Sequence, residues 1–307
     1  GWTADHVGKL VTYARITIDP SLHASFASAF QSGIPDITFD VSGFGCYDPR
    51  NASHVLGSPA TYTYSSNAAI MAANYLIHPL GAAFPASVVD WASVVQAANV
   101  CDEPVALKSG GSEARYAAAL TWSTDERHEA VLARLEAAMA GRVIPPGVKY
   151  VIQAGALPAP SATITPDDYV GSGLQLSETP ALADMANGVR GKFSSPLHHY
   201  EQRDFPPVVD AAAVTADGAP YWRDIDLSAV TSASQAQRIA KIELQRARRG
   251  AGAAVETALT KFDIVAGDVV SITDALAGLT AATYRVEEDT LTEEFECRFG
   301  LLATASR

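Results

Sequence analysis

The chain has 307 residues and a formal net charge of −12, from 22 lysine and arginine residues against 34 aspartate and glutamate residues. Hydrophobic residues make up 48% and charged residues 18%, which is typical of a globular chain and excludes an intrinsically disordered one. The acidic balance disfavours a protein that wraps a nucleic-acid backbone, because phosphate contacts need lysine and arginine. An acidic passage would instead let DNA slide through without sticking, because like charges repel.

Three features bear on the cellular compartment. Cys46, Cys101 and Cys297 are far apart and form no CxxC pair, which predicts a chain made in a reducing cytosol without a disulfide framework or a cysteine zinc site. No run of about 18 apolar residues occurs, so no membrane anchor is expected. The first residues, GWTADHVGKL, show neither a signal-peptide pattern nor a starting methionine, so we expect a fragment of a longer protein.

Residues 1–104 are predicted to form a strand-rich first domain with two longer helices. Two strands rich in β-branched residues, with a short helix between them, are expected over residues 10–18, 37–41 and 21–30. The longer helices are expected over residues 66–76 and 87–100. Ser66 is the expected cap of the first, and Ser87 or Asp90 of the second.

Residues 105–157 are predicted to form a compact strand–helix–strand module. Its elements are expected over residues 114–121, 125–140 and 148–154. Ser123 or Thr124 caps the helix, whose acids come first, and Gly141 follows it.

Residues 158–307 are predicted to form a third, β-barrel-like domain. Residues 158–166 hold three prolines and no charge and are the expected linker. Strands are expected over residues 186–193, 254–262, 269–272, 282–286 and 294–299. The chain is therefore predicted to be an α+β, multi-domain protein of small β-barrel or sheet domains, each with one or two packing helices.

The clearest helix is predicted over residues 232–249. Ser232 and Gln235 fit a capping box, and Gly250 can supply the left-handed exit. Apolar residues recur at three- and four-residue steps and give one narrow stripe, made of Ala233, Ala236, Ala240, Leu244 and Ala247. We expect this helix to pack across a small sheet or barrel.

The same helix concentrates positive charge on an acidic chain. Residues 231–249 hold one acid and five basic side chains, which are Arg238, Lys241, Arg246, Arg248 and Arg249. Three interpretations stay open. The cations can form a solvated face that complements the helix dipole, contact an acidic neighbouring subunit of the same chain, or bind DNA directly. The second interpretation makes these five residues candidates for an intersubunit contact.

The sequence carries no catalytic signature. It has no G-x-S-x-G, HExxH, GxxxxGK[ST] or GxGxxG motif, and Gly43-Phe-Gly45 is expected to be a β-turn. His198 and His199 are adjacent, so they would point to opposite faces of a strand, and no thiol or carboxylate stands at ligand spacing. Acid pairs such as Asp102 and Glu103 are expected in solvated turns. No catalytic, cofactor-binding or metal-binding residue is therefore predicted, and a structural or binding protein is favoured over an enzyme.

Several stretches, in order and over most of the chain, resemble one known family. They are GIPDI (33–37), YDPR (47–50), DWAS (90–93), AANVCDE (97–103), GSEARY (111–116), AMAG (138–141), NGVR (187–190), DFPPV (204–208), WRDI (222–225), TSASQAQRIAKIELQR (231–246) and GD (267–268). The set is similar to the tail-tip, or central tail hub, proteins of siphophages with lambda-like tails, also called host-specificity proteins.

The resemblance implies a virion protein, made in the host cytoplasm, that forms a homotrimeric hub at the distal end of the tail tube. It implies small barrel-like hub domains braced by helices, contacts with tape-measure, tail-tube and other tail-tip proteins, and DNA that passes through the lumen without specific binding. No cofactor is implied.

Two other functions compete with the hub. A receptor- or carbohydrate-binding module of the tail tip would need exposed aromatic residues in a groove, which the scattered Trp2, Trp91, Trp122 and Trp222 do not suggest. A cell-wall hydrolase of the tail tip would need a catalytic carboxylate pair or a zinc site.

Overall fold

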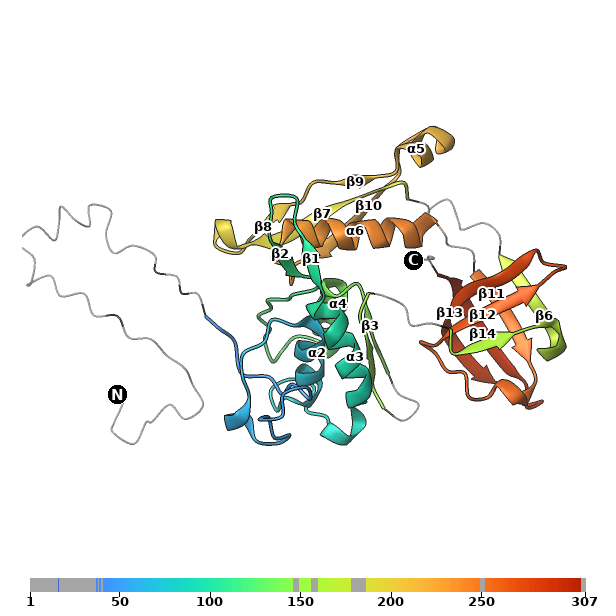
Figure 1. Cartoon of the computed structure of the whole chain (residues 1–307), viewed down its shortest axis with the longest axis horizontal. Helices are drawn as coiled ribbons and strands as arrows, with labels where there is room; N and C mark the ends of the chain where they lie inside the picture. Colours follow the sequence, from blue (N-terminus) through green and yellow to red (C-terminus); the bar gives the residue numbers. More distant parts are fainter. Residues whose placement is uncertain are drawn as a thin grey trace, which may run out of the picture. The chain divides into compact units, whose positions relative to one another are not determined.

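The computed structural model describes residues 16, 37, 39, 41–145, 149–155, 160–177, 186–248 and 252–304 (Figure 1). The chain divides into two units, residues 1–43 and residues 44–307. The strands predicted over residues 10–18 and 37–41 and the helix predicted over residues 21–30 fall on the first unit, largely outside the described residues. All described helices and strands belong to the second unit.

Three helices pack together in the first part of this unit: α2 (Ala68–Ile77), α3 (Trp91–Asp102) and α4 (His128–Ala138). Figure 1 shows them side by side, and α2 contacts both of the others. Helix α2 is alanine-rich, and Ala68, Ala69, Ala72 and Ala73 are fully buried. Small side chains let its neighbours approach closely, which explains why so short a helix has almost no exposed face.

The three predicted helices are confirmed, but their ends differ from the prediction. Helix α2 is capped by Asn67 instead of Ser66, because the Asn67 side chain accepts from two amides of the first turn. Asp90, one of the two expected caps, caps α3. Helix α4 is shorter than residues 125–140 because the Ser123 and Glu126 backbones already form a separate turn, with the Glu126 amide donating to the Ser123 carbonyl at 3.1 Å.

Two short hairpins flank the helices. Strand β1 (Pro104–Ala106) pairs with β2 (Ser112–Ala114), and β3 (Arg142–Ile144) pairs with β4 (Val151–Gln153). The strand predicted over residues 114–121 is wrong beyond Ala114. The chain there is extended, but successive amides donate to different elements: Tyr116 to the Cys101 carbonyl, Ala117 to Gln235, Ala118 to the Ser66 carbonyl and Ala119 to the Ala229 carbonyl.

A second layer is a four-stranded sheet centred on β7 (Gly188–Ser195), a strand predicted over residues 186–193. Strand β10 (Trp222–Leu227) runs parallel to β7, and β8 (Glu201–Asp204) and β9 (Val208–Val209) are antiparallel to it. Helix α5 (Ala211–Asp217) lies between β9 and β10 in the chain, and helix α6 (Ala233–Arg248) packs on β7.

Helix α6 confirms the predicted helix and its apolar stripe, since Ala236, Ala240, Leu244 and Ala247 are buried. Only one of the two hydrogen bonds of the predicted capping box forms. The Gln235 amide donates to the Ser232 hydroxyl at 3.3 Å, but the Gln235 side chain turns into the protein instead of returning to the helix start. Its carboxamide oxygen accepts from the Ala117 amide at 3.1 Å, and its nitrogen donates to the Ala117 and Ala138 carbonyls at 2.8 and 2.9 Å.

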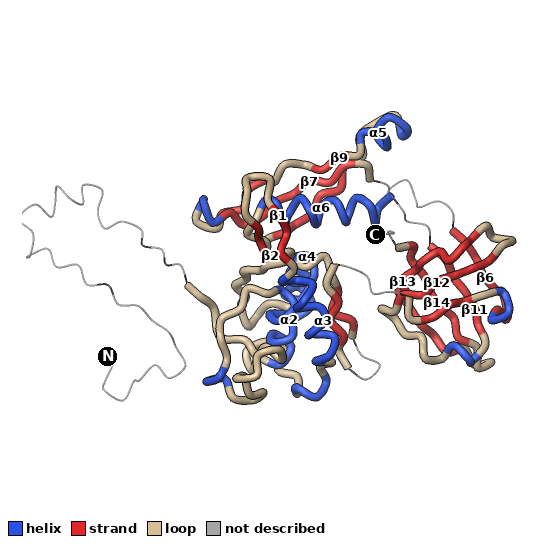
Figure 2. Tube along the Cα trace, viewed as in Figure 1, coloured by secondary structure: helices blue, strands red, loops and turns tan. Residues whose placement is uncertain are grey.

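The remaining strands form one curled six-stranded sheet (Figure 2). They are β5 (Ala162–Ile164), β6 (Tyr169–Ser177), β11 (Gly252–Thr257), β12 (Val269–Asp274), β13 (Leu279–Leu291) and β14 (Cys297–Ala303), in the order β5-β12-β13-β14-β11-β6. The last four of these strands in the chain confirm the four predicted C-terminal strands. Strand β5 lies inside the predicted linker, residues 158–166, because its parallel partner β12 is far along the chain and gives no local signal.

The buried apolar side chains form two clusters. The first joins α2, α3 and α4 to the β7 sheet and α6, through residues such as Leu76, Leu135, Val189 and Ile239. The second fills the curled sheet, with Ile164, Val255, Ile272 and Phe299 among its members. Helices packed on sheets beside a curled sheet confirm the α+β class. The division into residues 1–104, 105–157 and 158–307 stays a prediction.

Gln235 offers a direct test of how α6 is held. It is 1% exposed, and Gln235→Leu keeps its bulk while leaving the Ala117 amide and the Ala117 and Ala138 carbonyls without their partner. We predict a loss of about 3 kcal/mol or more in the free energy of unfolding, measured by chemical denaturation. Gln245→Leu, at an exposed position of the same helix, should change it by less than about 0.5 kcal/mol. Equal effects of the two changes would contradict this role.

Glu256 of β11 offers a second test, based on pH. The Ser172 amide and hydroxyl each donate to its carboxylate at 2.7 Å and Arg298 pairs with it, so its pKa falls from 4.5 to about 2. Because the folded-state pKa is depressed, this contribution to stability is complete above about pH 4.5 and is lost as the pH falls towards 2.

We predict that Glu256→Gln lowers the thermal unfolding midpoint at pH 7 and flattens its decline between pH 4.5 and 2. Circular dichroism melts at stepped pH measure both effects. Glu288→Gln on the neighbouring β13 is the matched control. An unchanged acid dependence in Glu256→Gln would show that this carboxylate does not stabilise the fold.

Candidate functional site

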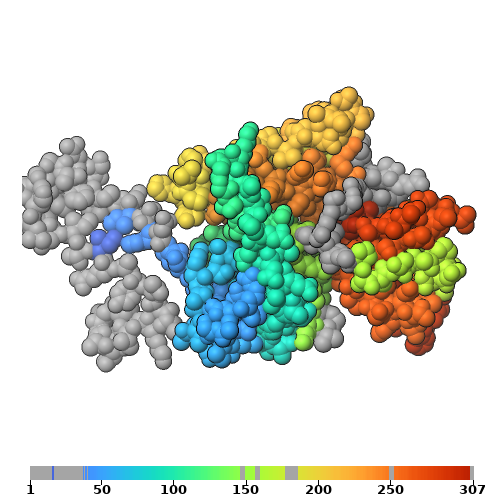
Figure 3. Space-filling view, in the orientation of Figure 1, coloured from blue at the N-terminus to red at the C-terminus, as the bar shows by residue number. Residues whose placement is uncertain are grey.

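The basic residues predicted on α6 contact other parts of the same chain. Arg238 pairs with Glu113 at 2.7 Å and donates to the Arg115 carbonyl at 2.9 Å, so it holds the β1–β2 hairpin, which Figure 3 shows beside α6. Arg246 pairs with Glu243 at 2.6 Å and donates to the Ala140 carbonyl at 2.7 Å, just after α4.

The last turn of α6 reaches α5 in the same way. Arg248 pairs with Asp217 at 2.5 Å, and hydrogen bonds from Asn187 and Arg248 hold the pKa of that carboxyl below its usual range. Lys241 is exposed and makes no ion pair with any residue that the structure describes, and Arg249 lies outside the described residues. Three of the five predicted residues therefore brace the fold, and an intersubunit contact by all five stays a prediction.

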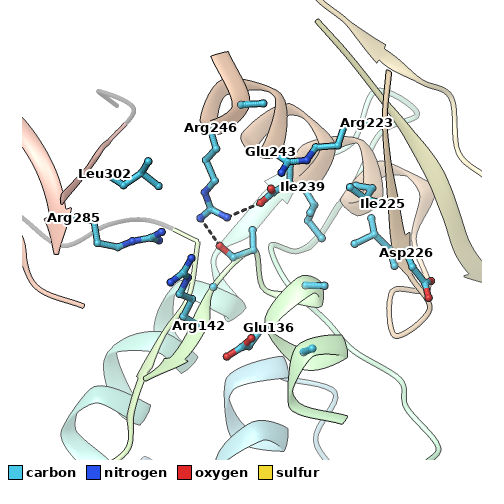
Figure 4. A pocket seen from close by; sticks show the side chains of 16 residues that line it. Glu136, Arg142, Arg223, Ile225, Asp226, Ile239, Glu243, Arg246, Arg285 and Leu302 are labelled. Carbon is cyan, nitrogen blue, oxygen red and sulfur yellow. Dashed lines mark hydrogen bonds and ion pairs between the residues drawn. The ribbon is translucent and has the colours of Figure 1, made fainter. Parts of the chain in front are cut away.

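A pocket of about 660 Å³ opens beside Arg246 (Figure 4). Residues of α4, β3, β10, α6, β13 and β14 line it. Apolar side chains form much of its wall, namely Ile225, Leu227, Ile239 and Leu302 with alanines of α4 and α6. Four arginines also line it: Arg142, Arg223, Arg246 and Arg285. We call this the arginine pocket.

The guanidinium groups of the arginine pocket outnumber the carboxylates that pair with them. Glu287 bridges Arg142, at 2.6 Å, and Arg285, whose Nε donates to it at 2.7 Å. Arg285 is only 7% exposed, and burial together with the nearby charge of Arg142 lowers its pKa. Arg223 is exposed and forms no ion pair within the described segments. An anion that entered the pocket would therefore gain Coulomb energy without displacing an existing partner of Arg223.

Three carboxylates line the arginine pocket: Glu136 on α4, Glu243 on α6 and the exposed Asp226 on β10. Burial raises the pKa of Glu136, although the Val143 amide donates to its carboxylate at 2.7 Å and partly opposes the rise. Glu243 is already paired with Arg246. The lining contains no histidine, cysteine or hydroxyl side chain. Because the four arginines outnumber the three lining carboxylates, the arrangement suits the binding of an acidic group with an apolar part, and the lining offers no hydroxyl, thiol or imidazole nucleophile.

The other residues considered from the sequence lie apart from the arginine pocket. His198 shares a hydrogen bond of 2.9 Å with the Ser195 hydroxyl in the turn after β7, and His199 follows in a left-handed conformation. Among the described residues, no group of three or more histidine, cysteine or acidic side chains could hold a metal ion. No helix in this part of the chain is long and apolar enough to cross a bilayer.

The three tryptophans within the described residues do not gather in a groove, and Trp2 lies outside those residues. Trp91 meets the Tyr47 ring edge-on at 5.0 Å, and Trp122 meets Tyr75 edge-on at 5.2 Å. Trp222 lies under the Arg190 guanidinium at 5.5 Å. Each ring therefore packs in its own local cluster.

Sequence reasoning missed Arg142, Arg223 and Arg285. They come from three separate strands, so no local pattern groups them. The one available signal is the position of Arg285 between Tyr284 and Val286, in a strand otherwise expected to be buried.

Comparison with known proteins identifies a family. A family model described as "Putative phage tail protein" matches residues 127–288, more than half of the 307 residues. This range includes α4, the β7 sheet, α6 and most of the curled sheet. A search of curated proteins finds no match.

Solved structures similar to the chain include the virion of a gene transfer agent particle and two prophage tail proteins. A chain of the virion of a native gene transfer agent particle is 20% identical, with a TM-score of 0.48, over 60% of this chain and 40% of that one. The prophage MuSo2 43 kDa tail protein from Shewanella oneidensis is 14% identical, with a TM-score of 0.39, over 60% and 53%. Prophage tail protein gp18 from Listeria monocytogenes EGD-e is 15% identical, with a TM-score of 0.36, over 63% and 55%.

The matched part thus amounts to 40% to 55% of the length of those chains. On the family match over residues 127–288, the chain belongs to this family of phage tail proteins.

Proposed function

We propose that the chain is a structural subunit of the distal tail tip, where three copies form a hub that closes the tail tube. In this role it supports tail assembly, contacts tail-tube, tape-measure and other tail-tip proteins, and lets DNA pass. The observation that carries the proposal is the open edge of the curled sheet. Strand β6 is nine residues long, and among the described residues it pairs on one side only, with β11.

An open edge of this kind is a liability for a free monomer. Its unpaired amides and carbonyls are a template for pairing with another chain, and soluble proteins normally cover or shorten such edges. Strand β6 contains neither lysine nor proline, the residues that commonly block edge pairing. A closed ring of subunits disposes of the edge, because each copy can cover the next. The chain belongs to a phage tail protein family, and a phage tail is an assembly in which such a ring would occur.

The charge of the chain suits a tube through which DNA moves. Its net charge is −12, and the helix with the most cations uses three of them on acids of the same chain. A surface with few free cations binds a phosphate backbone weakly, so DNA would pass without specific contacts.

The oligomeric state is the first test. We expect light scattering of the purified chain at increasing concentration to approach the mass of three copies of the 32.2 kDa chain. A strictly monomeric chain at high concentration would contradict the hub. Incubation with purified peptidoglycan should release no fragments, and release would instead support a tail-associated hydrolase.

The basic helix α6 gives a second test. Reversal of Arg246 or Arg248 would break internal ion pairs, so Lys241→Glu is the cleaner change. If the free cation on α6 contacts an acidic neighbour, Lys241→Glu should weaken self-association by about two- to fivefold without changing the unfolding midpoint. Lys108→Glu, in an exposed turn, is the matched control and should have no effect. Equal association of both variants and the parent chain would exclude Lys241 from the contact.

A further inference from the structure

The arginine pocket is built to receive an acidic group that carries an apolar side chain. Part of its wall is apolar, through Ile225, Leu227 and Ile239, and Arg223 has no ion pair within the described residues. Arg285, 7% exposed, adds a buried positive charge. A volume of about 660 Å³ lies in the usual range for a ligand pocket. The pocket is therefore larger than a single ion requires.

One segment of the same chain has the complementary composition. We define the acidic hairpin as residues 287–296, the end of β13 and the loop to β14, which holds six acids and no basic residue. Four of these acids are exposed: Glu288, Asp289, Glu293 and Glu294. Two large apolar side chains project among them, Leu291 at 46% and Phe295 at 68% exposure.

Phe295 has a backbone that bulky residues rarely adopt. Its φ is +60°, in the left-handed region. Its amide donates to the Thr292 carbonyl at 3.1 Å, which fixes the turn with the ring outward. Strained residues that display a side chain to solvent cluster at binding sites. The sequence Glu294-Phe295-Glu296 thus presents an exposed ring between two carboxylates.

The acidic hairpin cannot fill the pocket of its own chain. Arg285, which lines the pocket, and Leu291, at the hairpin tip, lie on the same strand β13. Leu291 is six positions after Arg285, and a strand rises about 3.3 Å per residue, so they are roughly 20 Å apart. Of the hairpin's side chains, the one with an ion pair to Arg285 among the described residues is Glu287, at the base of the hairpin. A hairpin tip in this pocket must therefore belong to a second copy.

We propose that the acidic hairpin of one copy docks in the arginine pocket of the next, with Phe295 against the apolar wall and the flanking carboxylates facing Arg223 and Arg142. The occupant is a second copy of this chain, chosen by charge complementarity. The inference rests on the proposed trimeric hub and deepens it. Hairpin and pocket are different surfaces, so the contact is heterologous, and repetition of such a contact generates a ring when the rotation closes.

The test is sedimentation velocity of the full chain and its variants at low and high salt. We expect Phe295→Ser and Arg223→Glu each to raise the dissociation constant of the oligomer by about tenfold or more, as for a central interface residue. Glu293→Lys with Glu294→Lys should act similarly. Combining Arg223→Glu with Glu294→Lys should restore association at least in part, because the attraction is rebuilt with exchanged signs.

Matched controls separate this contact from general effects. Leu276→Ser removes an apolar side chain that is fully exposed at another hairpin turn, and Glu129→Lys reverses an acid that is exposed on α4. Neither should change association. Unfolding midpoints should be the same in all variants, because every changed side chain is exposed.

The outcomes distinguish this inference from the hub proposal. A parent chain that forms trimers, with no sensitivity to Phe295→Ser or Arg223→Glu, would overturn the docking and leave the hub intact. A parent chain that stays monomeric would overturn both. Loss of association in both single variants without recovery in the charge exchange would show that the two surfaces contribute separately, and would also overturn the docking.

Discussion

The fold of residues 44–248 depends on one buried side-chain amide. Gln235 stands at the start of α6, and its three hydrogen bonds tie that helix to the extended segment around Ala117 and to the end of α4. A polar group at 1% exposure is tolerated only when its hydrogen bonds are made. Hydrogen bonds are directional, so the bonds of Gln235 fix the position of α6 on the β7 sheet more narrowly than apolar contact alone would. The position of α6 in turn places the arginines further along the helix, including Arg246 at the arginine pocket.

The basic side chains of α6 also hold neighbouring elements in place through ion pairs. Positive charge on one helix of an acidic chain can bind acids of the same chain or of a partner. In this structure Arg238, Arg246 and Arg248 bind acids or carbonyls of the same chain. Such half-buried pairs stabilise more than fully exposed ones, because the solvent screens them less. The cations of the arginine pocket differ, because Arg223 is unpaired within the described chain and Arg285 is buried near two other arginines. The pocket thus retains the capacity to attract an acidic partner.

Local signals in the sequence were enough to predict α2, α3, α4, α6 and the last four strands, but not the short helix α5. Apolar periodicity and end signals are contained within a few residues, as in α2, α3 and α6, and the errors in these three helices lie at their ends, as at the Asn67 cap of α2. Strands β5 and β6 could not be predicted. Strand β5 is short and pairs in parallel with distant β12, and the glycines of β6 weaken its strand pattern. At Gly171 the lack of a side chain leaves room for Glu256, since a Cβ would stand 2.4 Å from its carboxylate. The arginine pocket was equally hidden, because its four arginines come from four elements that only the tertiary fold brings together.

We propose that the chain, a member of a phage tail protein family, acts as a subunit of the tail-tip hub. The most direct measurement is an electron microscopy reconstruction of the intact tail of the parent particle, with this chain located in the density. We expect three copies around the tail axis at the distal end of the tube, with the curled sheets facing the neighbouring copies. Copies repeated along the tube, or found only in peripheral fibres, would contradict it.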